Sequence, residues 1–536
     1  MLSQADREAF DIFIVGGGVN GCGVARDAAG RGLRVALAEM NDLGSGTSSA
    51  STKLIHGGLR YLEYFEFRLV KESLAEREIL LQAMPHIIWP LRFILPYHSQ
   101  MRFSSDTPAS KLLNFIVPWQ KNRRPAWLIR LALLLYDSLG RRNILAGTSS
   151  LDLSKVLEGE PLRDEYQKAF EYSDCWVQDS RLVVLNARDA AARGARIMPR
   201  TRVVAVERQA SEWVVVTEDQ EGRCTSFRTN VLINATGPWA SDFLSDVIGS
   251  QRMDNLRLVR GSHIVTKRLY LHEKCYFFQG YDGRIIFVIP YEDDFTLIGT
   301  TDEDQASIKD TPTCSQKETT YLLEFVSKYF KEPISCDDVV WAYSGVRPLY
   351  DNCKDSASAA SRDYVIRLET SAPPLLNIFG GKLTTYRKLA ETALSKISPF
   401  LPNHGPSWTA GQVLPGGDFP INGAWNLVEE LCEQYPYLNS KWASRLVKHY
   451  GTDAYEILQG SRSTADLGEN FATTVTEREL EWGVRNEWVQ TAEDFLWRRT
   501  RLGLRFPKDE VDRLEVCINR IRHADRVAAP VLSNNE

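Results

Sequence analysis

The fold of this chain is set by the stretch Asp11-Ile12-Phe13-Ile14-Val15-Gly16-Gly17-Gly18-Val19-Asn20-Gly21, close to the N-terminus. Its first five residues form a short, mainly apolar run that predicts a buried parallel strand. The glycines that follow fill the three positions of a G-x-G-x-x-G pattern, and residues 22–31 predict a helix. A second predicted strand over residues 34–38 completes the pattern typical of a dinucleotide-binding βαβ unit.

The residues of this unit have distinct physical roles. Gly16 permits the tight turn, Gly18 lets the backbone approach a pyrophosphate, and Gly21 lets the helix pack close to the strand. The helix N-terminus offers free N–H groups and the positive end of a dipole to phosphates. The acid that ends the second strand is placed to accept hydrogen bonds from a ribose. The predicted cofactor-binding residues here are Gly16, Gly17, Gly18, Asn20, Gly21 and Glu39.

Length and composition limit the possible classes. The chain has 536 residues, which is too many for one ordinary domain, and its 43% hydrophobic and 25% charged content is typical of a soluble protein. A formal charge of −5 gives no reason to expect a nucleic-acid partner. Nine scattered cysteines without a C-x-x-C pair favour reduced thiols in the cytoplasm and no metal site. No apolar stretch is long enough to span a bilayer, and no signal peptide fits the first ten residues.

Two segments after the βαβ unit contain candidate ligand-binding residues. The loop over residues 41–53 is dense in Gly, Ser and Thr, and Ser48 and Ser49 are suited either to cap a helix or to contact phosphate oxygens; a flexible turn is the alternative. The run His56-Gly57-Gly58-Leu59-Arg60-Tyr61 places glycines beside charged residues, which suggests a backbone bent around a ligand. His56 also suits a buried core position, and spacing alone does not separate the two interpretations.

The second half of the chain repeats the strand–glycine–helix pattern. Residues 231–237 predict a buried strand that ends at Gly237, and residues 258–301 predict several short strands of an antiparallel, substrate-side sheet. The segment around Arg347 predicts a tight turn. A further strand over 375–379 precedes a glycine-rich helix start, whose N-terminus suits the stabilisation of negative charge on a bound cofactor. The predicted cofactor-binding residues in these segments are Gly237, Gly381, Lys382, Leu383 and Thr384.

Residues 89–142 differ from the rest of the chain. They combine tryptophans and leucine runs with the basic residues Lys111, Lys121, Arg123, Arg124, Arg130, Arg141 and Arg142. Such a stretch is suited to a membrane interface, although an ordinary core helix with a solvated basic face fits equally. Residues 400–419 are rich in Pro and Gly and predict a linker, and residues 425–522 predict a helical C-terminal domain.

Several longer motifs resemble one family. Ile14–Gly32 and Gly380–Ala390 resemble the two signature segments of FAD-dependent (aerobic, respiratory) glycerol-3-phosphate dehydrogenase. Residues 47–70, 170–183, 234–239, 260–265, 298–302 and 343–349 are similar to the same family, and residues 491–503 resemble its C-terminal domain. The stretch over 99–123 is longer than in the compact bacterial members.

The resemblance implies the fold and the domain division. It implies an α/β, FAD-binding Rossmann-like fold of the glutathione-reductase type, in the D-amino-acid-oxidase group, with an antiparallel-sheet substrate domain and a C-terminal helical domain. We expect an oxidoreductase body over residues 1–405, followed by the helical domain over 406–536. Within the body, we assign about 8–90, 175–250 and 340–400 to FAD binding, and about 91–174 and 251–339 to the substrate part.

The resemblance also implies the activity. The expected reaction oxidises sn-glycerol 3-phosphate to dihydroxyacetone phosphate, passes hydride to FAD and then electrons to a membrane quinone. It further implies peripheral attachment to the cytoplasmic face of the inner membrane and a homodimer. The alternatives are an oxidase that passes electrons to O2 and a non-catalytic flavoprotein that binds the nucleotide for structure or sensing.

The residue types suit this chemistry. A phosphate dianion calls for arginines, and Arg60 and Arg347 are the candidates, with Arg362, Tyr61 and Lys382 as supports. Removal of the C2 hydroxyl proton requires a base; the resemblance favours His56, and His263 is the competing candidate. Lys382 and the helix start after Gly381 are placed to stabilise negative charge on reduced flavin. The predicted catalytic residues are therefore His56, Arg60, Arg347 and Lys382.

Overall fold

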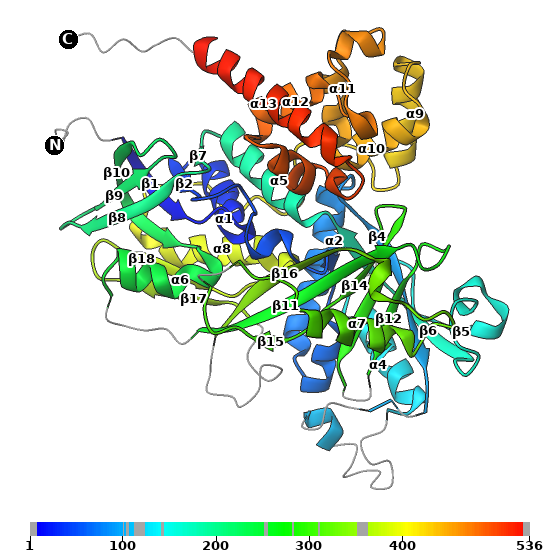
Figure 1. Ribbon diagram of the computed structural model, residues 1–536. Helices are drawn as coiled ribbons and strands as arrows, with labels where there is room; N and C mark the ends of the chain where they lie inside the picture. The colour runs from blue at the N-terminus through cyan, green and yellow to red at the C-terminus, as the bar shows by residue number, and fades with distance from the viewer. Residues whose placement is uncertain are drawn as a thin grey trace, which may run out of the picture.

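The structure is a computed structural model in which two sheets form the body and a group of helices forms a separate C-terminal domain (Figure 1). It describes residues 8–99, 101–102, 107–111, 124–140, 144–250, 256–280, 283–308, 311–350 and 363–528. The α/β fold with a helical C-terminal domain, predicted from the sequence, is confirmed.

The first sheet holds the predicted βαβ unit. Among the described residues it has eight strands, in the order β17-β18-β10-β1-β2-β7, with β9 paired to β10 and to β8. The central strand β1 (Ala9–Val15) runs parallel to β10 (Cys224–Asn234) and β2 (Val35–Ala38), and its side chains are buried on both faces. The other strands are β7 (Arg196–Met198), β8 (Arg202–Arg208), β9 (Trp213–Glu218), β17 (Val365–Glu369) and β18 (Leu375–Phe379).

Three helices cover one face of this sheet. Helix α1 (Val19–Gly30) contacts α5 (Asp179–Ala192) and α8 (Tyr386–Ile397), and all three contribute to one buried cluster with the sheet. Small residues such as Ala25 and Ala28 allow α1 to lie close to its neighbours. This packing fixes the N-termini of α1 and α8 at the carboxyl ends of β1 and β18, where an open parallel sheet binds its ligand.

The second sheet is the predicted antiparallel, substrate-side sheet. In the described part of the chain it has ten strands, in the order β15-β11-β14-β13-β12-β4-β6-β3, with β16 paired to β11 and β5 to β6. Most pairs are antiparallel, and β12 with β4 is parallel. The strands are β3 (Leu54–Ile55), β4 (Ile88–Tyr97), β5 (Ser149–Asp152), β6 (Lys168–Val177), β11 (Leu256–Lys267), β12 (Cys275–Gln279), β13 (Ile285–Tyr291), β14 (Phe295–Gly299), β15 (Glu303–Asp304) and β16 (Val339–Tyr350).

Alternate residues of this sheet enter two different cores. Val265 and Phe277 pack with helices α2 (Phe67–Ala83) and α4 (Ala126–Leu139) on one face. Their neighbours Ile264 and Tyr276 pack with α7 (Gln316–Ser327) on the other. The period of two therefore places a helical layer on each face of the sheet. Strand β16 belongs to this sheet, although it falls in the range 340–400 that we assigned to FAD binding.

Helix α4 exposes an apolar face. Ile129, Leu133 and Tyr136 are buried against the sheet and α2, whereas Trp127, Leu131, Leu134 and Leu135 are 58%, 54%, 47% and 37% exposed. No helix in the described parts of the chain is both long and apolar enough to cross a membrane. The predicted interface residues Lys121, Arg123, Arg141 and Arg142 lie outside the described residues, as does most of the stretch 99–123.

One predicted member of the basic stretch is not at the surface. Arg124 is buried, forms an ion pair with Glu63 and donates a hydrogen bond to Gln279 Oε1 (2.7 Å). The prediction that Arg124 faces a membrane was therefore wrong, because its partners come from segments distant in the sequence. Arg130 is half-buried and donates to Thr148 Oγ1 (3.0 Å), while Lys111 is exposed.

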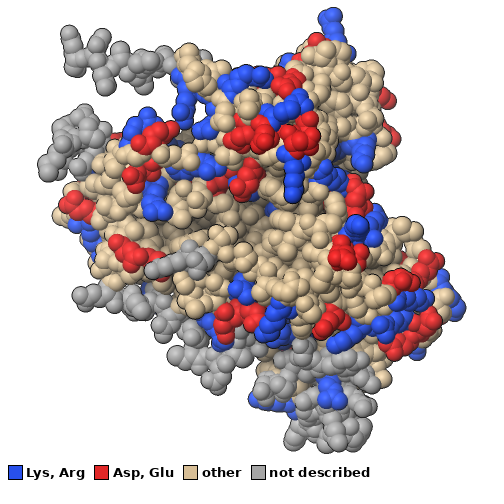
Figure 2. All heavy atoms as spheres, viewed as in Figure 1, with Lys and Arg blue, Asp and Glu red and all other residues tan. Residues whose placement is uncertain are grey.

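The C-terminal domain has two cores. The first contains α9 (Ala424–Gln434), α10 (Ser440–Tyr450) and α11 (Ala454–Leu458), and the second contains residues of α12 (Glu477–Glu487) and α13 (Lys508–Ala528). Side chains cap two of these helices: Asn439 accepts from Trp442 N, and Thr476 accepts from Glu479 N. Basic and acidic side chains are interspersed over this domain on the face shown in Figure 2. The domain also has surface ion pairs such as Arg485–Asp525 (3.0 Å).

Candidate active site

The turn between β1 and α1 has the geometry that a dinucleotide requires. Gly16 has a φ of +112°, and a Cβ on Gly21 would lie 1.9 Å from the Gly16 carbonyl oxygen. Both positions therefore exclude any other residue. A Cβ on Gly17 would lie 2.7 Å from Glu39 Cβ, so the loop after β2 also sits tightly against the turn.

Glu39 and Ser48 hold this turn from two other loops. The Glu39 carboxylate accepts hydrogen bonds from Gly17 N (2.7 Å) and Asn41 N (2.8 Å). Burial raises the pKa of Glu39, and these two N–H groups act in the opposite direction. Ser48 Oγ accepts from Val19 N (3.0 Å), so it caps the N-terminus of α1 from a distance of 29 residues in the sequence. Of the alternatives open for Ser48, the structure therefore shows helix capping.

The second glycine turn lies beside the first. Asn20 Nδ2 donates to the Gly380 carbonyl oxygen (3.0 Å), while Asn20 Oδ1 is buried without a hydrogen-bond partner among the described residues. Gly380 and Gly381 have φ values of +73° and +101°. Leu383 and Thr384 follow at the start of α8, and Gly237, with φ of +61°, follows the neighbouring strand β10. This edge of the sheet fits a dinucleotide in three respects. Two helices begin there, the amide oxygen of Asn20 lacks a partner among the described residues, and the glycine turns carry no side chains that would block a ligand.

Two buried cationic nitrogens near this edge have no partner. Lys382 Nζ lies 4.1 Å from the centroid of the Tyr61 ring, and neither Lys382 Nζ nor Arg60 Nε has a hydrogen-bond partner among the described residues. A buried cationic nitrogen without an acceptor is costly. The charge of Arg60 acts on the nearby Glu63, whereas Lys382 forms no ion pair among the described residues. These two atoms therefore indicate a site for an anionic ligand that supplies the missing partner.

His56 lies between the two sheets. Its backbone N–H donates to Thr384 Oγ1 (3.3 Å), which ties the residue to the start of α8. The half-buried imidazole ring meets the ring of Phe287 edge to face, with 6.3 Å between centroids. The next residue, Gly57, donates its N–H to Tyr136 Oη (2.7 Å), and a Cβ there would lie 2.5 Å from Leu74 Cδ2. The His56–Gly57 backbone is therefore held from the cofactor side and from α4.

His263 is more enclosed. It is 1% exposed, its Nε2 lies 2.9 Å from Thr52 Oγ1, and its ring stacks on Tyr343 with 4.9 Å between centroids. Burial, followed by the charges of Arg347 and Lys53, holds the pKa of His263 well below its usual range. His263 is therefore neutral at neutral pH and a weak base.

The strand register brings the two histidines to one face of the sheet. His263 on β11 is opposite Gly299 on β14, and Gly299 is opposite Phe287 on β13, on which His56 packs. A side chain on Gly299 would meet His263, since a Cβ there would lie 2.0 Å from Cδ2 of that ring. Glycine at position 299 therefore makes room for the His263 ring against β14.

Arg347 lies in strand β16 and not in the predicted tight turn, so that prediction was wrong. Gly345 and Pro348 suggested a turn, but among the described strands β16 is paired on one side only, to β11, where a residue without an N–H is tolerated. Arg347 is half-buried, pairs with Asp302 and donates to Thr300 Oγ1 (2.9 Å). Arg362 lies outside the described residues.

A buried network beside His263 was not found from the sequence. Lys53 Nζ lies 2.8 Å from both oxygens of Asp179 and 5.2 Å from the centroid of the Tyr343 ring, and Arg501 also donates to Asp179 (3.0 Å). Burial, followed by the charge of Arg501, lowers the pKa of Lys53 to about 8. No local pattern marks these residues, because Asp179 and Arg501 are 322 residues apart.

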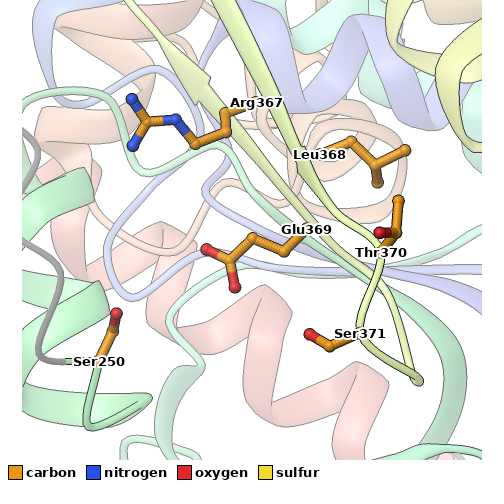
Figure 3. Close-up of a pocket in the computed structure, with 6 residues that line it drawn as sticks. All are labelled: Ser250, Arg367, Leu368, Glu369, Thr370 and Ser371. Carbon is orange, nitrogen blue, oxygen red and sulfur yellow. The ribbon is translucent and has the colours of Figure 1, made fainter.

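A hollow elsewhere on the surface contains none of these residues. It has a volume of about 490 Å³ and is lined by Ser250 and by residues 367–371, at and beyond the end of β17 (Figure 3). Arg367 and Glu369 extend from the strand there, and Arg367 lies 5.7 Å from the centroid of the Tyr350 ring. None of the residues that line this hollow is a predicted catalytic residue or a neighbour of His56, His263 or Lys382 described above.

Comparison with known proteins identifies the class. A family model described as "FAD dependent oxidoreductase" matches residues 11–387, and one described as "C-terminal domain of alpha-glycerophosphate oxidase" matches residues 407–524. The chain therefore belongs to the FAD-dependent oxidoreductase family, and its cofactor is FAD. The resemblance found in the sequence motifs is confirmed.

Individual relatives narrow the class. The chain is 45% identical to D-erythritol 1-phosphate dehydrogenase of Brucella abortus, over 95% of this chain and 97% of the relative. It is 43% identical to aerobic glycerol-3-phosphate dehydrogenase of Escherichia coli, over 95% and 97% respectively. The structure of glycerol-3-phosphate dehydrogenase from Bacillus halodurans complexed with FAD superposes with a TM-score of 0.70, at 25% identity, and covers 99% of this chain and 97% of that one.

Proposed function

We propose that this protein oxidises sn-glycerol 3-phosphate to dihydroxyacetone phosphate, with FAD as the hydride acceptor. The observation that carries the proposal is that two buried cationic atoms, Lys382 Nζ and Arg60 Nε, have no hydrogen-bond partner among the described residues. His56 precedes Arg60 by four residues, and its backbone N–H is bound by Thr384, two residues after Lys382. A phosphate dianion would accept hydrogen bonds from both atoms and would balance the charge of Lys382. The similarity to glycerol-3-phosphate dehydrogenase over most of the chain supports the same substrate.

The roles of the residues follow from their positions. When bound, FAD supplies the acceptor for the hydrogen on C2 of the substrate. Arg60 and Lys382 bind the anionic groups, and Arg347, itself fixed by Asp302 and Thr300, contributes a third positive charge. An imidazole nitrogen of His56 takes the proton of the C2 hydroxyl. We assign the base to His56 because His263 has one nitrogen against Thr52 and a lowered pKa.

D-Erythritol 1-phosphate is the second candidate substrate. The relative that carries this name is as similar to the chain as the glycerol-3-phosphate dehydrogenases are. Both compounds are polyols with a terminal phosphate, so the cationic residues serve either one. The ratio of kcat/KM values for the two substrates, measured with a soluble dye acceptor, decides between them, because that ratio reports differential transition-state binding.

The cofactor is expected to be bound without a covalent link. Cys22, in the first turn of α1, is buried, its Sγ lies 3.6 Å from the Gly17 carbonyl oxygen, and burial raises the pKa of its thiol. A protonated thiol is a poor nucleophile toward flavin. Acid or heat precipitation should therefore release free FAD into the supernatant, measured by absorbance. A yellow pellet under a colourless supernatant would contradict this prediction.

We further propose that the electron acceptor is a membrane quinone and that attachment is peripheral, on the cytoplasmic face of the inner membrane, with a homodimer as the assembly. The exposed face of α4, defined by Trp127, Leu131, Leu134 and Leu135, supports an interfacial contact. Transfer of electrons to O2 is the alternative. Release of peroxide in proportion to substrate, without a quinone, would favour it.

The membrane proposal predicts the effect of removing this face. Replacing Trp127, Leu131, Leu134 and Leu135 by Ser should lower the partition coefficient onto anionic vesicles by at least about tenfold, because each large apolar side chain contributes roughly 1.5–3 kcal/mol when fully buried. Quinone reduction should fall in parallel, and activity with a soluble dye should be kept. Vesicle co-sedimentation at low and high salt measures the change.

A matched control distinguishes this face from other exposed apolar residues. Trp425 on α9 is 60% exposed in the C-terminal domain, much like Trp127, and Trp425→Ser should leave vesicle binding unchanged. A loss with Trp425→Ser and none with the α4 variant would move the attachment surface to the C-terminal helices.

A further inference from the structure

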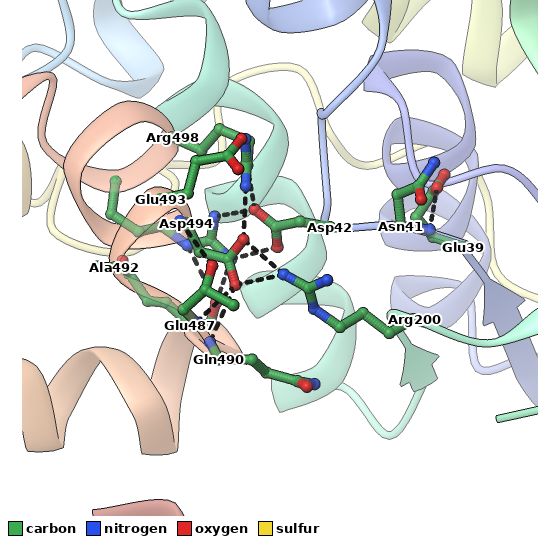
Figure 4. A network of polar contacts seen from close by, with 12 residues as sticks. Glu39, Asn41, Asp42, Arg200, Glu487, Gln490, Ala492, Glu493, Asp494 and Arg498 are labelled. Carbon is green, nitrogen blue, oxygen red and sulfur yellow. Dashed lines mark hydrogen bonds and ion pairs between the residues drawn. The ribbon is translucent and has the colours of Figure 1, made fainter. Parts of the chain in front are cut away.

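The C-terminal domain reaches the cofactor loops through buried arginines. Asp42 pairs with Arg499 through its two oxygens, at 2.8 Å each. It also pairs with Arg498 at 2.5 Å (Figure 4). Both arginines belong to the helical turn η15 (Asp494–Arg499). Asp42 and Arg499 are 2% and 1% exposed, so this contact is part of the interior.

Asp42 lies in the loop that returns to the first glycine turn. Glu39 binds Gly17 N three residues before Asp42, and Gly44 N donates to the Gly17 carbonyl oxygen (3.0 Å) two residues after it. The arginines of η15 therefore hold the middle of a loop whose two ends contact the same glycine.

Arg501 holds the later part of the same loop, which contains Ser49 and Ser51. Its guanidinium donates to the Ser49 carbonyl oxygen (2.9 Å) and to Asp179 Oδ1 (3.0 Å). Asp179 also accepts from Ser51 Oγ (2.8 Å) and from Lys53 Nζ. Arg501, Asp179 and Lys53 are 7%, 0% and 1% exposed, so two buried cations share one carboxylate.

The loop that Arg501 holds serves both halves of the active site. Its residue Ser48 caps α1, the helix that faces the cofactor, and its residue Thr52 contacts Nε2 of His263. A row of aromatic rings makes a second connection to the same histidine. Trp497 of the C-terminal domain stacks on Trp341, which stacks on Tyr343, which stacks on His263, with 4.5, 4.8 and 4.9 Å between successive centroids.

We propose that the C-terminal domain is a working part of the oxidoreductase site, and that Arg501 is the positioning residue through which it fixes Ser48 at the cofactor helix and Thr52 at His263. Two cations on one carboxylate exceed what neutralisation of Asp179 requires. Lys53 Nζ, from within the loop, also donates to the Ser49 carbonyl oxygen (3.2 Å), so Arg501 adds a second donor to this carbonyl, and this donor comes from the C-terminal domain. The substrate-turnover part of this inference rests on the proposed function, and the cofactor part rests on FAD alone.

The test compares two C-terminal arginines at the same domain boundary. Arg501→Gln should speed FAD release from the holoenzyme, followed by flavin fluorescence on dilution, and lower kcat with the dye acceptor, each by about 10–100-fold, as is typical when a supporting hydrogen-bond partner is lost. The KM for substrate should change much less. Arg501→Lys, which keeps one donor, should recover part of both losses.

The matched control is Arg505→Gln. Arg505 also lies in the C-terminal domain and contacts the body of the protein. Its partner there is the exposed Asp294, between β13 and β14 (2.7 Å), and not a residue of the loop 41–53. FAD release and kcat should stay at wild-type values in this variant. Wild-type FAD release and kcat in Arg501→Gln, or losses of equal size in both variants, would overturn the proposal. If Arg501→Gln does not fold, unchanged FAD release in Arg501→Lys would overturn it as well.

Faster FAD release with Arg501→Gln supports the inference even if sn-glycerol 3-phosphate proves not to be the substrate. Release is measured without substrate, so a failure of the proposed function leaves this readout intact.

Discussion

Replacing Lys382 by methionine is expected to raise the barrier to glycerol 3-phosphate oxidation by about 2–5 kcal/mol in kcat/KM, because the variant removes one partner of a desolvated charge pair. The Lys382 amine is buried over the Tyr61 ring without a hydrogen-bond partner among the described residues. Its charge is therefore balanced only when an anion is bound. Steady-state kinetics with a dye acceptor measure the loss.

Stability should move in the opposite direction to activity. Methionine removes a cation whose burial is uncompensated in the free protein, so the free energy of unfolding should not fall. Lys388→Met is the matched control, since Lys388 lies on α8, the helix that follows Lys382, and is exposed and paired with Glu391 at 3.2 Å. It should keep wild-type kinetics. Equal kcat/KM values in the two variants would show that Lys382 is an ordinary helix-start lysine.

Replacing His56 by glutamine is expected to lower kcat by about 10²–10⁴-fold, the usual contribution of a general base. A base must be deprotonated to act, so activity that depends on it rises with pH through its pKa. If the plot of kcat against pH shows a fall in activity toward acidic pH, that fall, called the acidic limb, should be absent in His56→Gln. His263 does not account for that limb, because its pKa is held well below the usual range by burial and by Arg347.

The comparison variant is His263→Gln. Glutamine can keep a hydrogen bond to Thr52, so we expect a smaller loss and an unchanged acidic limb. Dithionite should reduce the flavin fully in both variants, which controls for cofactor loading. A larger loss and a missing limb in His263→Gln, with His56→Gln near wild type, would exchange the two assignments.

Local patterns predicted the elements that depend on neighbouring residues. The run from Asp11 to Gly21 predicted β1, the turn and α1 because each glycine has its reason within a few residues. Short apolar runs within residues 258–301 predicted several strands of the second sheet for the same reason. The helical C-terminal domain followed from amphipathic segments that bury one face each.

Contacts between distant segments were not predictable in this way. Arg124 appeared to belong to a basic surface, but its partners Glu63 and Gln279 are 61 and 155 residues away. Arg347 appeared to lie in a turn, because nothing near Pro348 shows that β16 is paired on one side only. The arginines of the C-terminal domain gave no signal, since Asp42 and Arg499 are 457 residues apart.

An anaerobic titration of the holoenzyme with sn-glycerol 3-phosphate, followed by flavin absorbance, tests the central proposal most directly. We predict that one equivalent bleaches the oxidised flavin band, that D-erythritol 1-phosphate does so to the extent that it is a substrate, and that glycerol and lactate, which lack the phosphate, do not. A band that persists with both phosphorylated polyols, in protein whose flavin dithionite reduces, would contradict the proposed function.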